Sequence, residues 1–277
     1  MDKQRLKKLL IGDITWKRML KSAVFIYVFF AVYVYFRADS MIFLPQPSSY
    51  QDTKDTLKLK TKDNQPLSAV HLPNPTAKYT ILYIHGNAED LGDIQPVLEQ
   101  LRNLGFSVFA YDYRGYGTSQ GTPTENHAYE DINTVYRHLT EKLNIKPQQI
   151  IVFGRSVGGG SAVDLASRQP VAGLIIESTF TSAFRVVVPF PILPFDKFNN
   201  LDKIKKVKCP VLVMHGKLDD IIPFEHSEKL FAAVSSPKLS LWIENANHND
   251  FSVVAGEKYG KTLREFANLV SQQQRIF

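Results

Sequence analysis

The chain has 277 residues, enough for one large domain with an appendage, and its 44% hydrophobic and 22% charged content excludes an intrinsically disordered protein. Its net charge is +6, but residues 1–21 carry seven Lys and Arg against two Asp and so account for five of those charges. The rest of the sequence is nearly neutral, which argues against a nucleic-acid partner.

The front of the chain divides into a basic segment at 1–21 and an apolar segment at 22–40. Residues 22–36 are uncharged, nearly all apolar and without a polar face. A bilayer core of about 30 Å needs roughly 20 helical residues, and flanking Lys and Arg can snorkel, so we expect an uncleaved single-pass anchor. A secretory signal peptide and a buried core helix are the alternatives. The lysine-rich flank predicts a cytoplasmic N-terminus and therefore an extracytoplasmic domain.

Residues 41–277 are expected to form one α/β domain. The alternating segments 57–60 and 67–72 predict an antiparallel hairpin. From Tyr79 onward, apolar strand-like runs alternate with helical stretches, which predicts a mainly parallel sheet covered by helices on both faces. We expect those helices near residues 90–104, 125–142, 157–168, 223–234 and 250–272.

Two of the expected strands lead into loops of distinctive composition. The strand at 79–84 precedes His85-Gly86-Asn87-Ala88-Glu89-Asp90, and the strand at 106–110 precedes Tyr111-Asp112-Tyr113-Arg114-Gly115-Tyr116-Gly117. We interpret Asp112 and Arg114 as a structural pair or as hydrogen-bonding groups for these loops. His85, like His215 in a later His-Gly pair, is interpreted as a structural polar group and not as a catalytic base.

The most informative stretch is Gly154-Arg155-Ser156-Val157-Gly158, which follows the apolar run 150–153 and precedes a helix start. In that context G-x-S-x-G is typical of a nucleophile elbow, where flanking glycines let a strand and a helix pack closely around a tight turn. The alternative is a glycine-rich loop with an incidental serine. An elbow also needs an oxyanion hole, and we expect its two main-chain N–H donors to come from Val157 and Asn87.

Residues 178–206 form a connecting segment that we interpret in two ways. They are rich in Phe, Val and Pro and lie between the strand at 171–177 and the strand beginning at Pro210. The segment is interpreted either as an apolar cap that receives an acyl chain or as a loop packed on the sheet. It is too short for a large closed lid, so an open site is expected.

The base and its acid are expected after the last two strands. Asp219 and Asp220 follow the strand that begins at Pro210, and Glu177 is a third possible acid. His248 is the last histidine and follows the strand at 238–243. The order serine, acid, histidine matches that of a triad on this kind of sheet, in which neutral imidazole takes the serine proton and the acid orients the ring.

These segments together resemble the α/β-hydrolase superfamily, and more closely its Bem46-like branch, which is similar to the membrane-associated depalmitoylases of the α/β-hydrolase-domain type. The matching stretches lie between residues ~79 and 251 in the expected order. The pattern G-x-x-D before two apolar residues and Pro favours Asp219 over Asp220. Where those depalmitoylases carry an N-terminal cysteine cluster, this chain has an apolar segment, and its single cysteine is Cys209.

The sequence therefore predicts a membrane-anchored serine hydrolase that cleaves an ester or thioester through Ser156, His248 and Asp219. The expected substrate is a small-molecule or lipid-like acyl compound, or an acylated protein. No cofactor and no metal is expected. A serine peptidase of the prolyl-aminopeptidase-like type is the first alternative, although such enzymes usually carry a larger, acidic cap. A non-catalytic binding protein on the same fold is the second.

Overall fold

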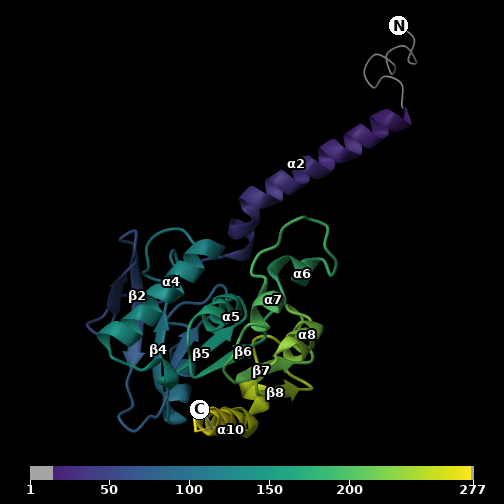
Figure 1. Ribbon diagram of the computed structural model, residues 1–277. Coiled ribbons are helices and arrows are strands. Elements are labelled where there is room, and N and C mark those ends of the chain that lie inside the picture. The colour runs from purple at the N-terminus through teal and green to yellow at the C-terminus, as the bar shows by residue number, and fades with distance from the viewer. Residues whose placement is uncertain (1–14, 276–277) are drawn as a thin grey trace. The chain divides into compact units, whose positions relative to one another are not determined.

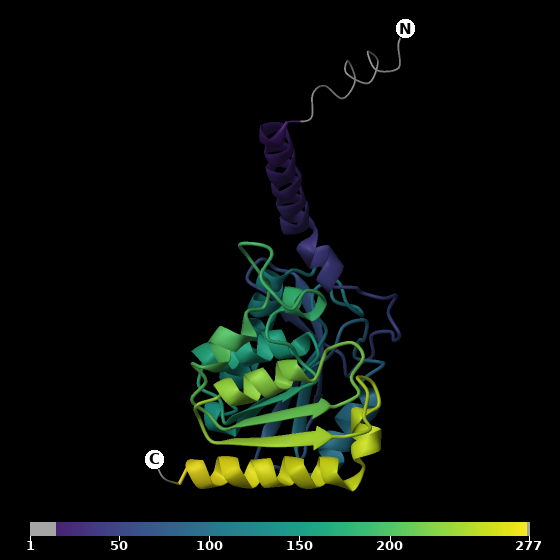
Figure 2. The ribbon, with the colours of Figure 1, turned by 90° about the vertical axis from the view of Figure 1, so that its right-hand side faces the viewer.

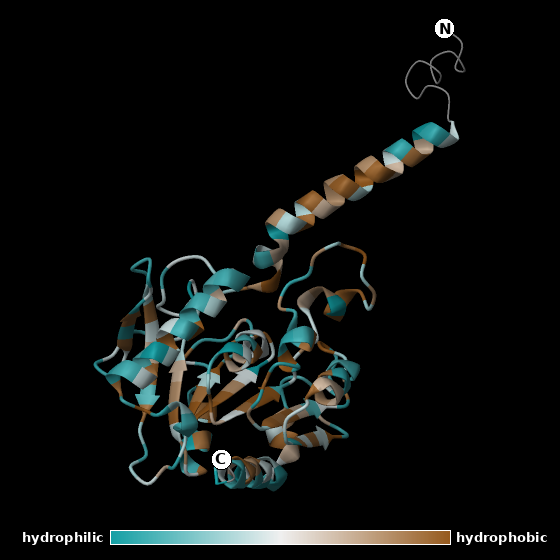
Figure 3. Ribbon diagram, in the orientation of Figure 1, coloured by the Kyte–Doolittle hydropathy of each residue, from teal (hydrophilic) through white to brown (hydrophobic). Residues whose placement is uncertain are grey.

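The structure, a computed structural model, describes residues 15–275, so positions 1–14 of the expected basic segment lie outside the described residues. The first part of the chain is one helix, α2 (Trp16–Ile42), which has 27 residues and a length of about 40 Å at 1.5 Å per residue. It extends beyond the expected 22–40 at both ends, because the flanking Lys, Arg, Leu and Met residues are themselves good helix formers. Figure 3 shows apolar residues along its central turns.

Helix α2 is long and apolar enough to cross a membrane. Its most apolar window has a mean hydropathy of 1.8, and a signal sequence can have the same length and composition. A bilayer core of about 30 Å is shorter than the helix, so the polar turns at the two ends can extend beyond the core.

The second part, from Ile42 onward, contains an eight-stranded sheet within the described residues, in the order β1-β2-β4-β3-β5-β6-β7-β8 (Figure 1). β1 (Leu57–Lys60) and β2 (Pro66–Leu72) form the predicted antiparallel hairpin, and β2 also runs antiparallel to β4. The other neighbours pair in parallel, as predicted. Their bounds are β3 (Thr80–Ile84), β4 (Ser107–Tyr111), β5 (Ile150–Arg155), β6 (Gly173–Glu177), β7 (Val211–Gly216) and β8 (Lys238–Ile243).

Helices cover both faces of this sheet, because alternate strand residues point to opposite sides. Ile150 and Val152 of β5 belong to one core cluster, together with α4 (Glu125–Arg137), α5 (Gly158–Arg168) and α8 (Glu225–Ala233). Ile151 and Phe153 belong to the other, with α3 (Gln95–Asn103) and α10 (Glu257–Gln273). Figure 2 shows α8 and α10 on opposite sides of the strands. The fold is the expected α/β-hydrolase arrangement.

Two of the expected helices differ in their bounds from the sequence-based expectation, and the one expected at 125–142 has that span but changes its type near the end. Helix α3 begins at Gln95 instead of near residue 90, because the preceding turn is held by the Asp90 carboxylate. Helix α4 continues as one π-helical turn, η1 (His138–Lys142), and a short 3₁₀ turn, η2 (Pro147–Gln149), precedes β5. The stretch expected at 250–272 forms two helices, α9 (Phe251–Ala255) and α10, because Gly256 adopts φ 53° between them.

The segment 178–206 forms two short helices joined by a loop, α6 (Ala183–Val187) and α7 (Asn200–Ile204). Three large apolar side chains in and next to this loop are exposed, Val187 at 84%, Phe190 at 60% and Ile192 at 40%.

Candidate active site

Ser156 lies on the turn between β5 and α5, with a backbone φ of 52°. This left-handed conformation is uncommon for a residue with a side chain and matches the strained elbow that the motif predicts. The flanking glycines are required by close packing. A Cβ added at Gly154 would lie 2.5 Å from the Gly158 carbonyl oxygen, and one at Gly158 would lie 2.3 Å from the Ile84 carbonyl oxygen.

The structure brings the three residues of the expected triad together. His248 Nε2 lies 3.1 Å from Ser156 Oγ, and His248 Nδ1 lies 2.8 Å from Asp219 Oδ2. All three residues are buried. Both nitrogens of the ring are therefore within hydrogen-bond distance of the groups that a proton relay requires.

The environment of Asp219 keeps its carboxyl group ionised. Burial alone would raise its pKa, but hydrogen bonds from His215, His248 and the Ile222 N–H outweigh burial and hold the pKa below its usual value. Oδ1 accepts the N–H groups of Ile221 and Ile222 at 3.0 and 2.7 Å, which leaves Oδ2 for the two histidines. An ionised acid at this position favours the His248 tautomer with a proton on Nδ1, so that Nε2 can accept the serine proton.

The two rival acids occupy other places. Asp220 is exposed, and its main-chain N–H donates to Asn247 Oδ1 at 3.2 Å. Glu177 is buried at the end of β6 with its Oε1 3.6 Å from Arg155 Nε. Burial raises the pKa of Glu177, although the nearby Arg155 charge opposes this shift. Asp219, and neither rival, lies at hydrogen-bond distance from His248 Nδ1.

Arg155 is a site residue that the sequence interpretation did not single out. Its guanidinium contacts Glu89 Oε1 at 2.5 Å, Asn249 Oδ1 at 2.8 Å and the His248 carbonyl oxygen at 3.1 Å. Glu89 in turn accepts the Gly86 N–H at 2.9 Å. One side chain thus joins the elbow, the loop after β3 and the loop that carries His248. The only sequence signal was its place inside G-x-S-x-G, which says nothing about its partners.

The loop after β3 lies against the elbow, as an oxyanion hole requires. A Cβ added at Gly86 would be 3.5 Å from Ser156 Cβ. Among the hydrogen bonds of the described residues, none engages the main-chain N–H of Asn87 or of Val157. The side chain of Asn87 is engaged elsewhere, with the main chain of Ile42 and Leu44. The main-chain N–H groups of Asn87 and Val157 remain the predicted donors to a developing oxyanion.

The remaining polar residues of the motif loops are structural in their contacts. His85 Nδ1 lies 2.7 Å from the Gly86 carbonyl oxygen. His215 contacts Ser227 Oγ and the Ile222 carbonyl oxygen, and its Nε2 also lies 3.1 Å from Asp219 Oδ2, so it supports the acid and does not contact Ser156 among the described hydrogen bonds. Asp112 and Arg114 do not form the pair that was one of the two expectations. Asp112 accepts from Tyr50 Oη and the Leu91 N–H, while Arg114 binds three other carboxylates, those of Asp63, Glu130 and Asp131.

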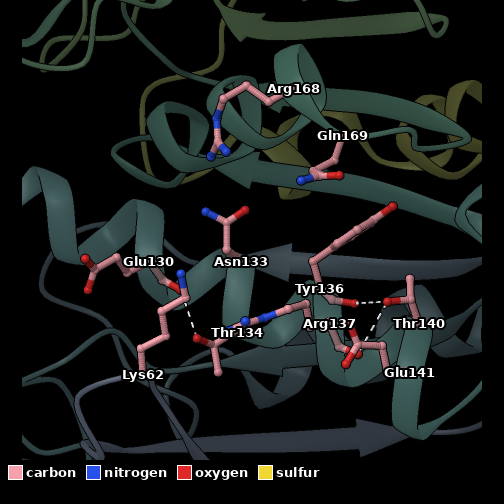
Figure 4. Close-up of a pocket in the computed structure, with 10 residues that line it drawn as sticks. All are labelled: Lys62, Glu130, Asn133, Thr134, Tyr136, Arg137, Thr140, Glu141, Arg168 and Gln169. Atoms are coloured by element: carbon pink, nitrogen blue, oxygen red, sulfur yellow. Dashed lines mark hydrogen bonds between the residues drawn. The ribbon is translucent and has the colours of Figure 1, made fainter.

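A separate polar cavity of about 470 Å³ lies beside α4, and no member of the expected triad lines it (Figure 4). Its charged walls mix both signs, so they create no strong field for an ionic ligand. The lining residues are Lys62, Glu130, Asn133, Thr134, Tyr136, Arg137, Thr140, Glu141, Arg168 and Gln169. Within residues 15–275, no group of three or more His, Cys, Asp or Glu residues is arranged to hold a metal ion.

Comparison with known proteins shows the family to which the chain belongs. Residues 75–194 match the family Serine aminopeptidase, S33, and residues 193–271 match the Prolyl oligopeptidase family. The chain is 41% identical to human alpha/beta hydrolase domain-containing protein 17B over 203 residues, covering 72% of this chain and 69% of that protein. It is 36% identical to alpha/beta hydrolase domain-containing protein aho-3 of Caenorhabditis elegans over 207 residues, covering 74% of this chain and 62% of that protein.

Solved structures show the same fold at low sequence identity. The esterase Pf2001 of Pyrococcus furiosus superposes with a TM-score of 0.69 at 20% identity, covering 83% of this chain and 98% of that one. Est1E of Butyrivibrio proteoclasticus, solved with ferulic acid bound, gives a TM-score of 0.63 at 20% identity, covering 76% and 99%. The resemblance to the Bem46-like branch is confirmed: the chain belongs to the α/β-hydrolase superfamily, in the family of alpha/beta hydrolase domain-containing protein 17.

Proposed function

We propose that this protein is a membrane-anchored serine hydrolase that cleaves an ester or thioester of an apolar acyl group. The observation that carries the proposal is the hydrogen-bonded series Ser156–His248–Asp219, with contacts of 3.1 and 2.8 Å. A buried serine beside an imidazole that is oriented by a carboxylate is the arrangement for nucleophilic acyl transfer.

In the proposed reaction, Ser156 Oγ attacks the acyl carbonyl carbon while His248 Nε2 takes its proton. The Asn87 and Val157 N–H groups stabilise the negative oxygen of the tetrahedral intermediate. His248 then gives the proton to the departing alcohol or thiol, which leaves an acyl-enzyme on Ser156. His248 then takes a proton from a water molecule as that water attacks the acyl carbon. When the bond between Ser156 Oγ and the acyl carbon breaks, His248 returns the proton to Oγ, which releases the carboxylic acid and restores the enzyme.

The cap supports an apolar acyl group. Val187, Phe190 and Ile192 are exposed on it. A cavity of about 590 Å³ begins beside Thr181 and has a mixed lining, in which Val186 and Pro189 of the cap lie among charged residues such as Arg185 and Asp196, and no triad residue lines it. Thr181 follows Thr179 by two residues, and the Thr179 hydroxyl donates to the Ser156 carbonyl oxygen at 2.7 Å. The exposed apolar side chains of the cap, on the segment that follows the contact of Thr179 with the elbow, support a lipid-like substrate.

Labelling with a fluorophosphonate probe and turnover of p-nitrophenyl esters of increasing chain length test the proposal. Wild type should be labelled and Ser156→Ala should not, and longer acyl chains and acyl thioesters should be preferred substrates. Aminoacyl anilides are the matched comparison, because the two matching families are named for peptidases. Turnover of anilides alone would establish the peptidase alternative, and a wild type without labelling would favour a non-catalytic binding protein.

For the membrane, we propose that α2 is an uncleaved anchor with its N-terminus in the cytoplasm. Lys17, Arg18 and Lys21 lie at its beginning, and positive charge next to a span favours the cytoplasmic side. The mass of the mature protein in a membrane fraction distinguishes an anchor from a cleaved signal. Protease added to sealed inverted vesicles should leave the C-terminal domain intact, and digestion there would reverse the orientation.

A further inference from the structure

The side chain of Asn87 binds the main chain that leaves helix α2. Its Nδ2 donates to the Ile42 carbonyl oxygen at 2.7 Å, and its Oδ1 accepts the Leu44 N–H at 3.0 Å. One carboxamide thus satisfies a carbonyl and an N–H two residues apart, as a neighbouring strand would. We define Ile42–Leu44 as the exit segment.

The exit segment is also held by its middle side chain. Phe43 is 3% exposed and makes edge contacts with Tyr113 and Phe198, with ring centroids 6.1 and 5.9 Å apart. The hydroxyl of Tyr116 donates to Asn87 Oδ1 at 2.6 Å and accepts the Leu44 N–H at 3.0 Å. Burial of a whole Phe side chain is strongly favourable, so this docking is more than a surface contact.

The same residues support the loop after β3. The Tyr113 hydroxyl donates to the His85 carbonyl oxygen at 2.9 Å, and the Tyr113 and His85 rings are in edge contact at 4.6 Å. The loop itself is conformationally demanding, since Ala88 has a φ of 57°. Asn87 therefore lies in a strained turn whose position depends on aromatic packing and on its own bonds to the exit segment.

We propose that the exit segment is a positioning element for the oxyanion hole, so that displacing it from Asn87 slows acyl transfer. The inference rests on the proposed function, in which the Asn87 N–H stabilises the oxyanion. Only two side-chain torsions separate the carboxamide of Asn87 from its main chain. Holding the carboxamide in place therefore also holds the main-chain N–H. The Ser156–His248–Asp219 contacts do not involve the exit segment and should survive its displacement.

The test uses the full chain and compares Phe43→Ala and Tyr116→Phe with the matched control Phe106→Ala. Phe106 is 5% exposed but belongs to the core cluster on the other face of the sheet. The measurements are kcat and KM on a p-nitrophenyl ester, normalised to the fraction of protein labelled by fluorophosphonate. Since losing one oxyanion donor costs ~10²–10³ in kcat, partial misplacement should lower kcat by about 10-fold or more.

The expected result is a lower kcat with little change in KM for Phe43→Ala and Tyr116→Phe, and partial rescue by Phe43→Leu. Phe106→Ala should lose stability but keep kcat per labelled site. Tyr116→Phe keeps the ring and its packing, so it decides the question if Phe43→Ala does not fold. Equal kcat in all variants, or an equal loss in the control, overturns the inference while the proposed function stands. A wild type with neither labelling nor turnover refutes the proposed function and this inference with it.

Discussion

Arg155→Met is the sharpest test of how the site is held together. The Arg155 side chain is 12% exposed and donates to Glu89, to Asn249 and to the carbonyl oxygen of His248. Methionine replaces the aliphatic stem of Arg155 with an unbranched side chain, but it is shorter, leaves the space of the guanidinium empty and donates no hydrogen bond. The loop that carries His248 would lose its hydrogen bonds to residue 155, while the three side chains of the triad would stay chemically unchanged.

The size of the effect on stability follows from the burial of the partners. Glu177 is 6% exposed and Glu89 is 28% exposed, so the change leaves one deeply buried carboxylate without its cation. Breaking a buried pair in this way costs about 3–5 kcal/mol of unfolding free energy. Because burial raises the pKa of Glu177, this carboxyl can take up a proton, and we expect a loss near the lower end of that range.

The effect on catalysis follows from the loop contact. A hydrogen bond from a charged donor contributes about 1.5–3 kcal/mol. If the bond to the His248 carbonyl holds the ring within reach of Ser156, its loss lowers kcat roughly 10- to 100-fold. The double variant Arg155→Met/Glu177→Gln removes the buried charge as well, so it should regain stability but not kcat.

Urea unfolding and steady-state turnover of a p-nitrophenyl ester measure the two effects separately. Arg114→Met is the matched control, since Arg114 is 1% exposed, pairs with three carboxylates and contacts no triad residue among the described hydrogen bonds and ion pairs. It should lose stability but keep kcat per labelled site. The reasoning is refuted if both arginine variants lower kcat equally, or if Arg155→Met/Glu177→Gln recovers wild-type kcat.

Three further predictions concern the elbow and the acid. Ser156→Ala should lose fluorophosphonate labelling and at least ~10³-fold in kcat with little change in urea midpoint. Gly158→Ala should lower both stability and labelling, because the added Cβ would lie 2.3 Å from the Ile84 carbonyl oxygen. Asp219→Asn should lower kcat by about 10⁴-fold by favouring the wrong His248 tautomer. The pKa of Asp219 is lower in the folded than in the unfolded state, so its ionised carboxylate stabilises the fold fully above about pH 4. This stabilisation is lost as the pH falls through the folded pKa. Between about pH 5 and about pH 3, the urea midpoint of Asp219→Asn should therefore fall less than that of the wild type.

The sheet and the serine turn could be predicted because their signals are local. The apolar run 150–153 and the glycines around Ser156 specify a strand, a tight turn and a close helix within nine residues. Arg155 and Phe43 could not be assigned in this way. The partners of Arg155 lie 66 and 93 residues away, and those of Phe43 lie in two other loops, so no periodicity or spacing records them. Such contacts depend on which loops the folded sheet brings to one edge.

The choice between Asp219 and Asp220 shows how a short pattern can encode both a turn and a site. Asp219 Oδ1 accepts the N–H groups of Ile221 and Ile222, so its carboxylate builds the turn in which it sits. That use fixes the direction of Oδ2, which lies 2.8 Å from His248 Nδ1. The next residue, Asp220, is exposed, because the turn that Asp219 closes directs the adjacent side chain outward. An acid one position later could not cap the turn and reach the histidine at the same time, and moving the carboxylate with Asp219→Asn/Asp220→Glu should therefore fail to restore turnover.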